Sequence, residues 1–256
     1  MSSPNGLVAV LVGLPLGTLL GGLGSVTGIG GGFLLMPALL WLFPHQSPGA
    51  LSVATMTVVF FNALSGTILS AREDRVRFRT GLVYGLLSLP LVWVGTRLQV
   101  LVDRGLFQVA FGVFLLAGAL FLVLRPGAPD TGTRPSRRIW VAGAALSLVI
   151  GLVSGFFGVG GGFLFVPLLA FFLGFPVFEA TATSQLIVGM GAAWTLVTGA
   201  PIHQLPFDPM LLSGLVAGVL VGAPLGTWAA GRWSQPVILR ILAGVLFVAG
   251  LKLMLF

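Results

Sequence analysis

The chain contains no cysteine and very few charged residues. Only 7% of its 256 residues are Asp, Glu, Lys or Arg, whereas a soluble protein carries about a quarter. Without cysteine the protein has no disulfide, no thiolate nucleophile and no thiolate metal site. Apolar residues make up 57% of the chain and form long runs from end to end. These runs identify an all-α polytopic membrane protein.

Acidic side chains are missing from the interior of the apolar runs. All six fall in expected loops or at expected helix ends: Glu73, Asp74, Asp103, Asp130, Glu179 and Asp208. Carboxylates inside a membrane normally mark cation or proton paths, so their absence disfavours a cation transporter. No cluster of histidine or carboxylate ligands suggests a metal site, and neither Ser25 nor Ser154 has a histidine on a plausible facing helix. We therefore expect neither an enzyme, nor a metal site, nor a cofactor.

The net charge of +7 comes mostly from arginines in short loops. This pattern indicates arginines that set the orientation of the protein in the membrane and contact anionic lipids at the cytoplasmic face, rather than nucleic-acid binding. Residues 1–5 carry no positively charged side chain ahead of the first apolar run, so we expect no cleavable signal peptide. The expected location is the cell inner (plasma) membrane, with several crossings.

A glycine-rich segment occurs twice. Residues 28–40 and 158–170 are identical at eight of thirteen positions at a constant offset of 130, and each begins with four glycines in five residues. Glycine costs a helix interior roughly 1 kcal/mol against alanine, and in lipid every freed backbone group must find a partner. Two matching segments that both destabilise a helix suggest that the backbone itself binds a ligand.

The glycine segments are expected to break two over-long apolar runs. The run 6–43 has 38 residues, which as one helix would be about 57 Å long, nearly twice the hydrocarbon thickness. It should break between Gly24 and Gly32, leaving a span over 6–23 and a short helix from Phe33. A second run at 139–175 should break at 155–162. The remaining expected helices are 49–70, 80–96, 105–124, 178–199, 209–231 and 236–255.

The chain thus consists of two homologous halves. We assign 1–124 to the first transmembrane repeat, 125–138 to a flexible cytoplasmic linker and 139–256 to the second repeat. If each broken run crosses once, there are eight spans and parallel halves; if each crosses twice, there are ten spans and inverted halves. The loop 71–79 is rich in arginine, while its counterpart 200–208 has no Lys or Arg. This difference favours inverted repeats, which place the two loops on opposite sides.

The motif Gly-x-Gly-Gly-Gly-Phe-x-x-x-Pro, present near the start of each half, resembles the TauE/SafE family. An Ala-Thr dipeptide on the following helix, at Ala54-Thr55 and Ala182-Thr183, fits the same pattern. That family is described as sulfite exporters and permeases for sulfonates and other organosulfur anions. The resemblance covers nearly the whole chain and implies a transporter of small oxyanions, without naming the anion.

Broken helices at matching positions of two repeats are the best sequence indication of a transport site. The free N–H groups and partial positive charge of a helix N-terminus suit an anion, and hydroxyl and amide side chains on the following helices add donors. The expected substrate-binding residues are Thr27, Gly28, Gly30, Gly31, Gly32, Phe33, Thr55, Asn62, Gly158, Gly160, Gly161, Gly162, Phe163, Thr183, Ser184 and Gln185.

Other interpretations stay open at this point. Paired glycines also serve close helix packing, and the polar residues of the following helices can simply bond across helices. One alternative is a transporter of another anion, such as thiosulfate, sulfate or a carboxylate, and a membrane scaffold without transport is a further alternative. For the main hypothesis we expect alternating access, with export driven outward by an inside-negative potential.

Overall fold

The computed structural model describes residues 6–27, 30–124, 136–198, 209–230 and 235–255, which are helical apart from short turns and contain no strand. The first half holds α1 (Gly6–Thr27), α2 (Gly32–Leu42), α3 (Pro48–Arg72), α4 (Phe78–Leu101) and α5 (Arg104–Leu124). The second holds α6 (Arg137–Phe157), α7 (Gly162–Pro167) with its π-helical continuation η1 (Leu168–Phe172), α8 (Val177–Thr198), α9 (Pro209–Ala230) and α10 (Gln235–Leu255). The expected all-α class and both helix breaks are confirmed.

The helices after the breaks are too short to cross a membrane alone. α2 has 11 residues, and α7 and η1 together have 6 and 5, so each is about 16 Å long against a hydrocarbon core of about 30 Å. By contrast, α3, α4, α5, α6 and α9 are each long and apolar enough to span a bilayer. The protein is therefore a multi-pass membrane protein with two half-length helices.

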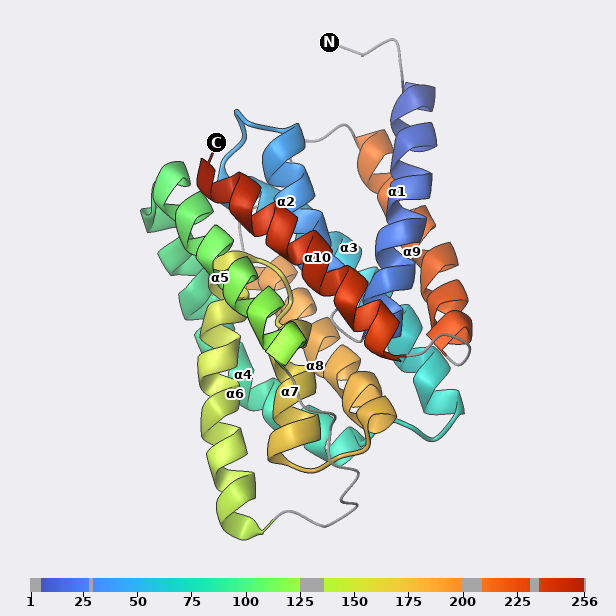
Figure 1. Cartoon of the computed structure of the whole chain (residues 1–256), viewed down its shortest axis with the longest axis vertical. Helices are drawn as coiled ribbons and strands as arrows, with labels where there is room; N and C mark the ends of the chain where they lie inside the picture. Colours follow the sequence, from blue (N-terminus) through green and yellow to red (C-terminus); the bar gives the residue numbers. More distant parts are fainter. Residues whose placement is uncertain (1–5, 28–29, 125–135, 199–208, 231–234, 256) are drawn as a thin grey trace.

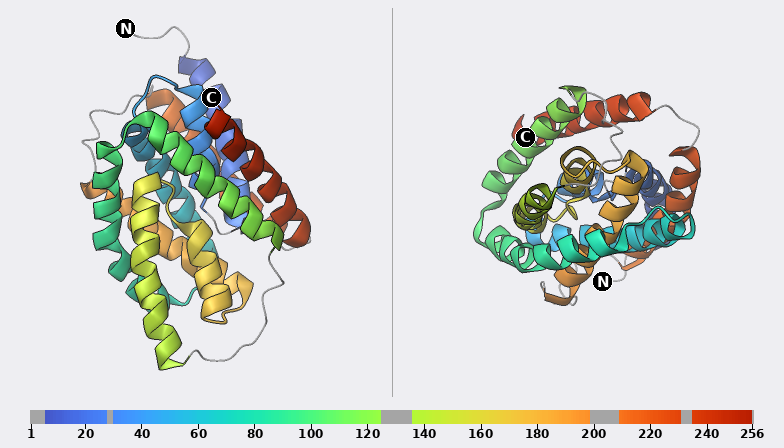
Figure 2. Two further views of the ribbon diagram at one scale, coloured as in Figure 1. Left: turned by 60° about the vertical axis from the view of Figure 1, so that its left-hand side comes forward. Right: turned by 90° about the horizontal axis from the view of Figure 1, so that it is seen from below.

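Packing is reciprocal between the two halves. α1 packs mainly on α9 and α6 on α4, while α3 packs on α8 and α5 on α10. Exchanging each helix for its counterpart in the other half reproduces the same pairs. In Figure 1, α1 descends from the N-terminus and α2 returns upward, whereas α6 rises from the lower end and α7 turns back down. The two broken hairpins thus point in opposite directions, and Figure 2 gives two further views of this arrangement.

Glycines bring the paired helices close together. α1 carries Gly13, Gly17 and Gly21 at four-residue spacing, facing a similar row on α9; a Cβ on Gly21 would lie 2.7 Å from the Cα of Val219. On α6, a Cβ on Gly155 would overlap the carbonyl oxygen of a residue on α4. Small residues at this spacing let backbones touch, which is how membrane helices gain packing energy.

Replacing Gly155 with leucine should separate α6 from α4. We expect Gly155→Leu to cost about 1–3 kcal/mol, the usual penalty for overpacking, and to lower the Tm of the detergent-solubilised protein. Gly244→Leu on α10 is the matched control, because nothing lies within 4 Å of a Cβ there. An equal loss of Tm in both variants would contradict this packing account.

Candidate functional site

The two glycine segments meet inside the protein, although they lie 130 residues apart in the chain. The rings of Phe33 and Phe163 stack with centroids 4.6 Å apart and planes 11° from parallel. Phe114 of α5 packs edge-on against both, at 5.6 and 6.2 Å. Beside the rings, a Cβ on Gly32 would lie 2.9 Å from the carbonyl oxygen of Val159. The first turns of α2 and α7 therefore touch directly.

Two valines from α3 and α8 press against both breaks. A Cβ on Gly160 would lie 2.9 Å from the Cγ1 atoms of Val59 and Val188, and one on Gly30 would lie 3.2 Å from the same methyl of Val188. Both valines are almost completely buried. The crossing of α3 and α8 thus forms a wall shared by the two breaks.

The breaks share one backbone conformation. Gly30 and Gly160 have φ of 86° and 81°, and Gly31 and Gly161 have φ of 62° and 72°. These left-handed values are open to glycine, whereas other residues pay roughly 1–2 kcal/mol to adopt them. The sequence duplication is therefore also a duplication of geometry.

The second break leaves a row of backbone donors without acceptors. Among the described residues, no backbone acceptor faces the N–H groups of Gly160, Gly161, Gly162 or Phe163; helix bonding resumes at Leu164, whose N–H donates to the carbonyl of Gly161 at 3.0 Å. All four donors belong to buried residues. Buried N–H groups normally have a partner, and at a helix N-terminus an anion serves as one.

Asn62 of α3 presents a further donor to the first break. Its side chain is 1% exposed, and its Nδ2 has no partner among the described residues. That nitrogen lies 2.9 Å and 3.5 Å from the positions that Cβ atoms on Gly24 and Gly31 would occupy. The other end of the amide is held, because Oδ1 accepts a hydrogen bond from Ser25 Oγ at 3.3 Å. The free end of the amide therefore points at the glycine break.

Two hydroxyl side chains of α3 lie on the same side of the helix as Asn62. Thr55 lies beside Gly32, with its Cγ2 3.2 Å from a Cβ built there, and its hydroxyl donates to a helix carbonyl at 2.9 Å. Ser52, three residues earlier, touches Gly158 of the second break, and within the described structure its buried Oγ has no partner. Residues 52, 55 and 62 thus bring polar side chains from one helix to both breaks.

Three predicted residues of α8 have their described contacts elsewhere. Thr183 accepts a hydrogen bond from the loop after α3, and the Ser184 hydroxyl donates to a helix carbonyl. Gln185 packs against α3, and its Oε1 has no partner within the described part of the chain. Thr27 ends α1, and Gly28 lies outside the described residues. The structure thus groups the α3 residues with the breaks more closely than those of α8.

Sequence reasoning did not assign Ser52, Val59 and Val188 to the site. Ser52 had a signal, because it lies one helical turn before Thr55 and so shares its face. The two valines had no sequence signal, because an apolar residue in an apolar helix does not indicate that it contacts a glycine of another segment.

Duplicated broken helices that meet between two halves, with backbone donors at their junction, define a membrane transporter fold. The family described as Sulfite exporter TauE/SafE matches residues 13–253, and the chain belongs to this family.

Named relatives agree with this class. Probable membrane transporter protein YunE of Bacillus subtilis (strain 168) is 28% identical over 96% of both chains. A probable membrane transporter protein of Xylella fastidiosa (strain 9a5c) is 33% identical over 88% of this chain and 83% of its own. MJ0441 of Methanocaldococcus jannaschii, with the same description, is 27% identical over 93% of both chains. No solved structure matches.

Asn62 should contribute little to folding, because among the described residues its amide makes one long hydrogen bond and leaves a donor unused. We expect Asn62→Ala to change stability by about 1 kcal/mol or less. Met56→Ala is the matched control on the same helix; Met56 is fully buried, and its truncation should cost about 2–5 kcal/mol. Thermal unfolding in detergent compares the two. Equal destabilisation would mean that Asn62 is a structural residue.

Proposed function

We propose that the protein transports a small sulfur oxyanion of the sulfite or sulfonate type, and that it exports this anion by alternating access. The observation that carries the proposal is the row of N–H groups of the second break that have no backbone acceptor among the described residues and lie where the two glycine breaks meet. The family description, Sulfite exporter TauE/SafE, supports the substrate class.

Backbone charge supports an anion as the ligand. A helix N-terminus carries roughly +0.5 elementary charge, so the starts of α2 and of the continuous α7–η1 segment supply about one positive charge without a lysine. The Asn62 amide and the Ser52 hydroxyl add neutral donors from the side. Several donors spread around one point suit the three or four oxygens of a pyramidal or tetrahedral anion.

The placement of acidic residues also favours anion export. The four acids that the structure describes lie at helix ends or in turns: Glu73, Asp74, Asp103 and Glu179. The site therefore places no described carboxylate against an anion. An inside-negative potential drives an anion outward by about 2.3 kcal/mol per charge per 100 mV, so export can proceed without a coupling ion.

We further propose that the halves are inverted in the membrane and contribute ten segments. The hairpins α1–α2 and α6–α7 each return toward the side on which they begin (Figure 1). This path fits two membrane segments for each broken apolar run. Reciprocal packing of equivalent helices lets one half rock against the other around the shared site. The membrane we expect is the cell inner membrane, with anionic lipids facing the arginine-rich loops.

Anion binding to the purified protein tests this function. We expect sulfite or a short sulfonate to raise the Tm saturably, and acetate and chloride to raise it less, with or without sodium. Gly31→Val and Gly161→Val should abolish the shift because a β-branched side chain is strained at their positive φ and distorts the break. Asn62→Ala should weaken binding about tenfold, as expected for one hydrogen bond to a charged ligand.

Gly244→Val is the control for these variants, because its Cβ meets open space, and it should bind as the unaltered protein does. A response to thiosulfate, sulfate or acetate alone would reassign the substrate while keeping the site. Unchanged sulfite binding in both glycine variants would place the site elsewhere.

A further inference from the structure

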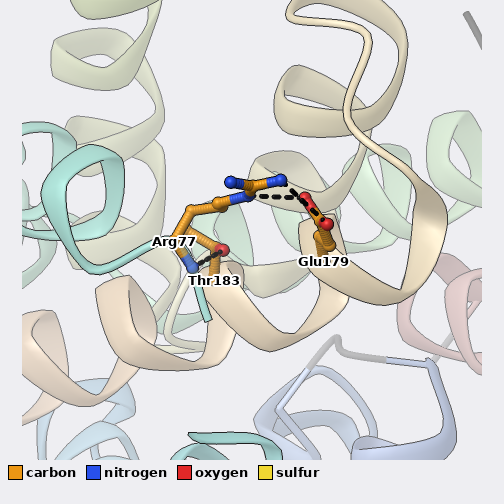
Figure 3. Close-up of polar contacts among 3 residues, drawn as sticks. All are labelled: Arg77, Glu179 and Thr183. Carbon is orange, nitrogen blue, oxygen red and sulfur yellow. Dashed lines mark hydrogen bonds and ion pairs between the residues drawn. The ribbon is translucent and has the colours of Figure 1, made fainter. Parts of the chain in front are cut away.

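A bidentate ion pair connects the two halves at one end of α8. Arg77, which precedes α4 in the first half, donates from Nε to Glu179 Oε2 at 2.7 Å and from its Nη2 to Oε1 at 3.0 Å. Glu179 lies in the first turn of α8 in the second half. Figure 3 shows the planar guanidinium facing the carboxylate. The hydrogen bond and negative charge of Glu179 raise the pKa of Arg77.

The backbone of the same arginine makes a second connection. The N–H of Arg77 donates to Oγ1 of Thr183 at 3.0 Å, one helical turn beyond Glu179 on the same face of α8. Thr183 is fully buried, whereas the side chains of Arg77 and Glu179 are 59% and 23% exposed. The loop after α3 is thus held at its surface by charge and underneath by a buried hydroxyl.

The other half has no equivalent ion pair in its sequence. At the offset of 128 that aligns Ala54-Thr55 with Ala182-Thr183, the counterpart of Glu179 is Leu51. Leu51 is completely buried and carries no charge. The loop 200–208, which corresponds to the loop holding Arg77, contains no Lys or Arg. The ion pair therefore exists at only one of the two equivalent positions.

We propose that Arg77, Glu179 and Thr183 form a latch that holds the cytoplasmic side of the transporter closed and makes its two sides unequal. This inference rests on the proposed alternating access. The loop 71–79 has four arginines, Arg72, Arg75, Arg77 and Arg79, which places it on the cytoplasmic side. Opening to the cytoplasm requires the first half to part from α8, and every bond of the latch crosses that boundary.

The first turn of α4, which follows the loop in the chain, borders a pocket. A cavity of about 370 Å³ lies beside the first turn of α4, lined by Arg79, Thr80 and Trp140 of α6. Because the ion pair is partly exposed, it biases the equilibrium between closed and open forms rather than fixing it.

The absence of cysteine from the chain allows a direct test by a single reporter thiol. Ala182 is 2% exposed and directly precedes Thr183, so Ala182→Cys places a thiol beneath the latch. Inside-out vesicles expose the cytoplasmic side to a membrane-impermeant maleimide. In this background, Arg77→Gln and Glu179→Gln should each speed labelling about 2- to 5-fold, the range expected for loss of a partly exposed pair.

Charge reversal separates the pair from general damage. The double variant Arg77→Glu/Glu179→Arg should return labelling to the slow rate, because it rebuilds the pair and keeps the backbone bond to Thr183. Arg72→Gln is the matched control from the same loop; Arg72 is exposed at the end of α3, and labelling should stay slow. Unchanged rates in the single variants, no restoration in the reversal, or faster labelling only from the outside would each overturn the latch.

Anion binding is measured on the same variants, so that the two proposals fail separately. If the latch variants label slowly while sulfite still binds, the latch is wrong and the transport proposal stands. If reversal restores slow labelling but no anion binds, the latch stands and the substrate proposal is wrong.

Discussion

The structure depends on the requirement that a buried backbone N–H group must find a partner. Two apolar runs are interrupted by glycines with positive φ, and at the second break four consecutive donors face no backbone acceptor among the described residues. Water supplies partners in a soluble protein, whereas inside a bilayer a bound ligand or a few trapped waters must do so. In the function that we propose, the cost of breaking the helix creates the capacity to bind an anion.

The rest of the architecture brings the two breaks together. Glycine rows allow α1 and α9 to pack closely, and reciprocal pairing of α1 with α9 and α6 with α4 gives the halves equivalent surroundings. The crossing of α3 and α8 then presses one valine from each helix against the breaks. Symmetry is broken at the surface, where one end of α8 carries the Arg77–Glu179 pair and its counterpart does not.

Much of the fold followed from local chemistry. The excessive length of the apolar runs predicted both breaks, and α2 and α7 begin at Gly32 and Gly162, one residue before the phenylalanines of the motif. The sequence did not predict which helices lie side by side, because the apolar pattern of a lipid-facing helix does not identify the helices that pack against it. The contact of Thr183 with the loop at Arg77 depends on that arrangement, and the sequence, which predicts this hydroxyl as a substrate ligand, gives no sign of it.

The number of anions bound per chain tests most directly whether the two breaks form one site. Isothermal titration of the purified protein with sulfite should give one anion per chain, and either Gly31→Val or Gly161→Val should abolish that single binding event, because both helix starts contribute donors to it. Two anions per chain, each lost in only one variant, would show two independent sites and contradict the account.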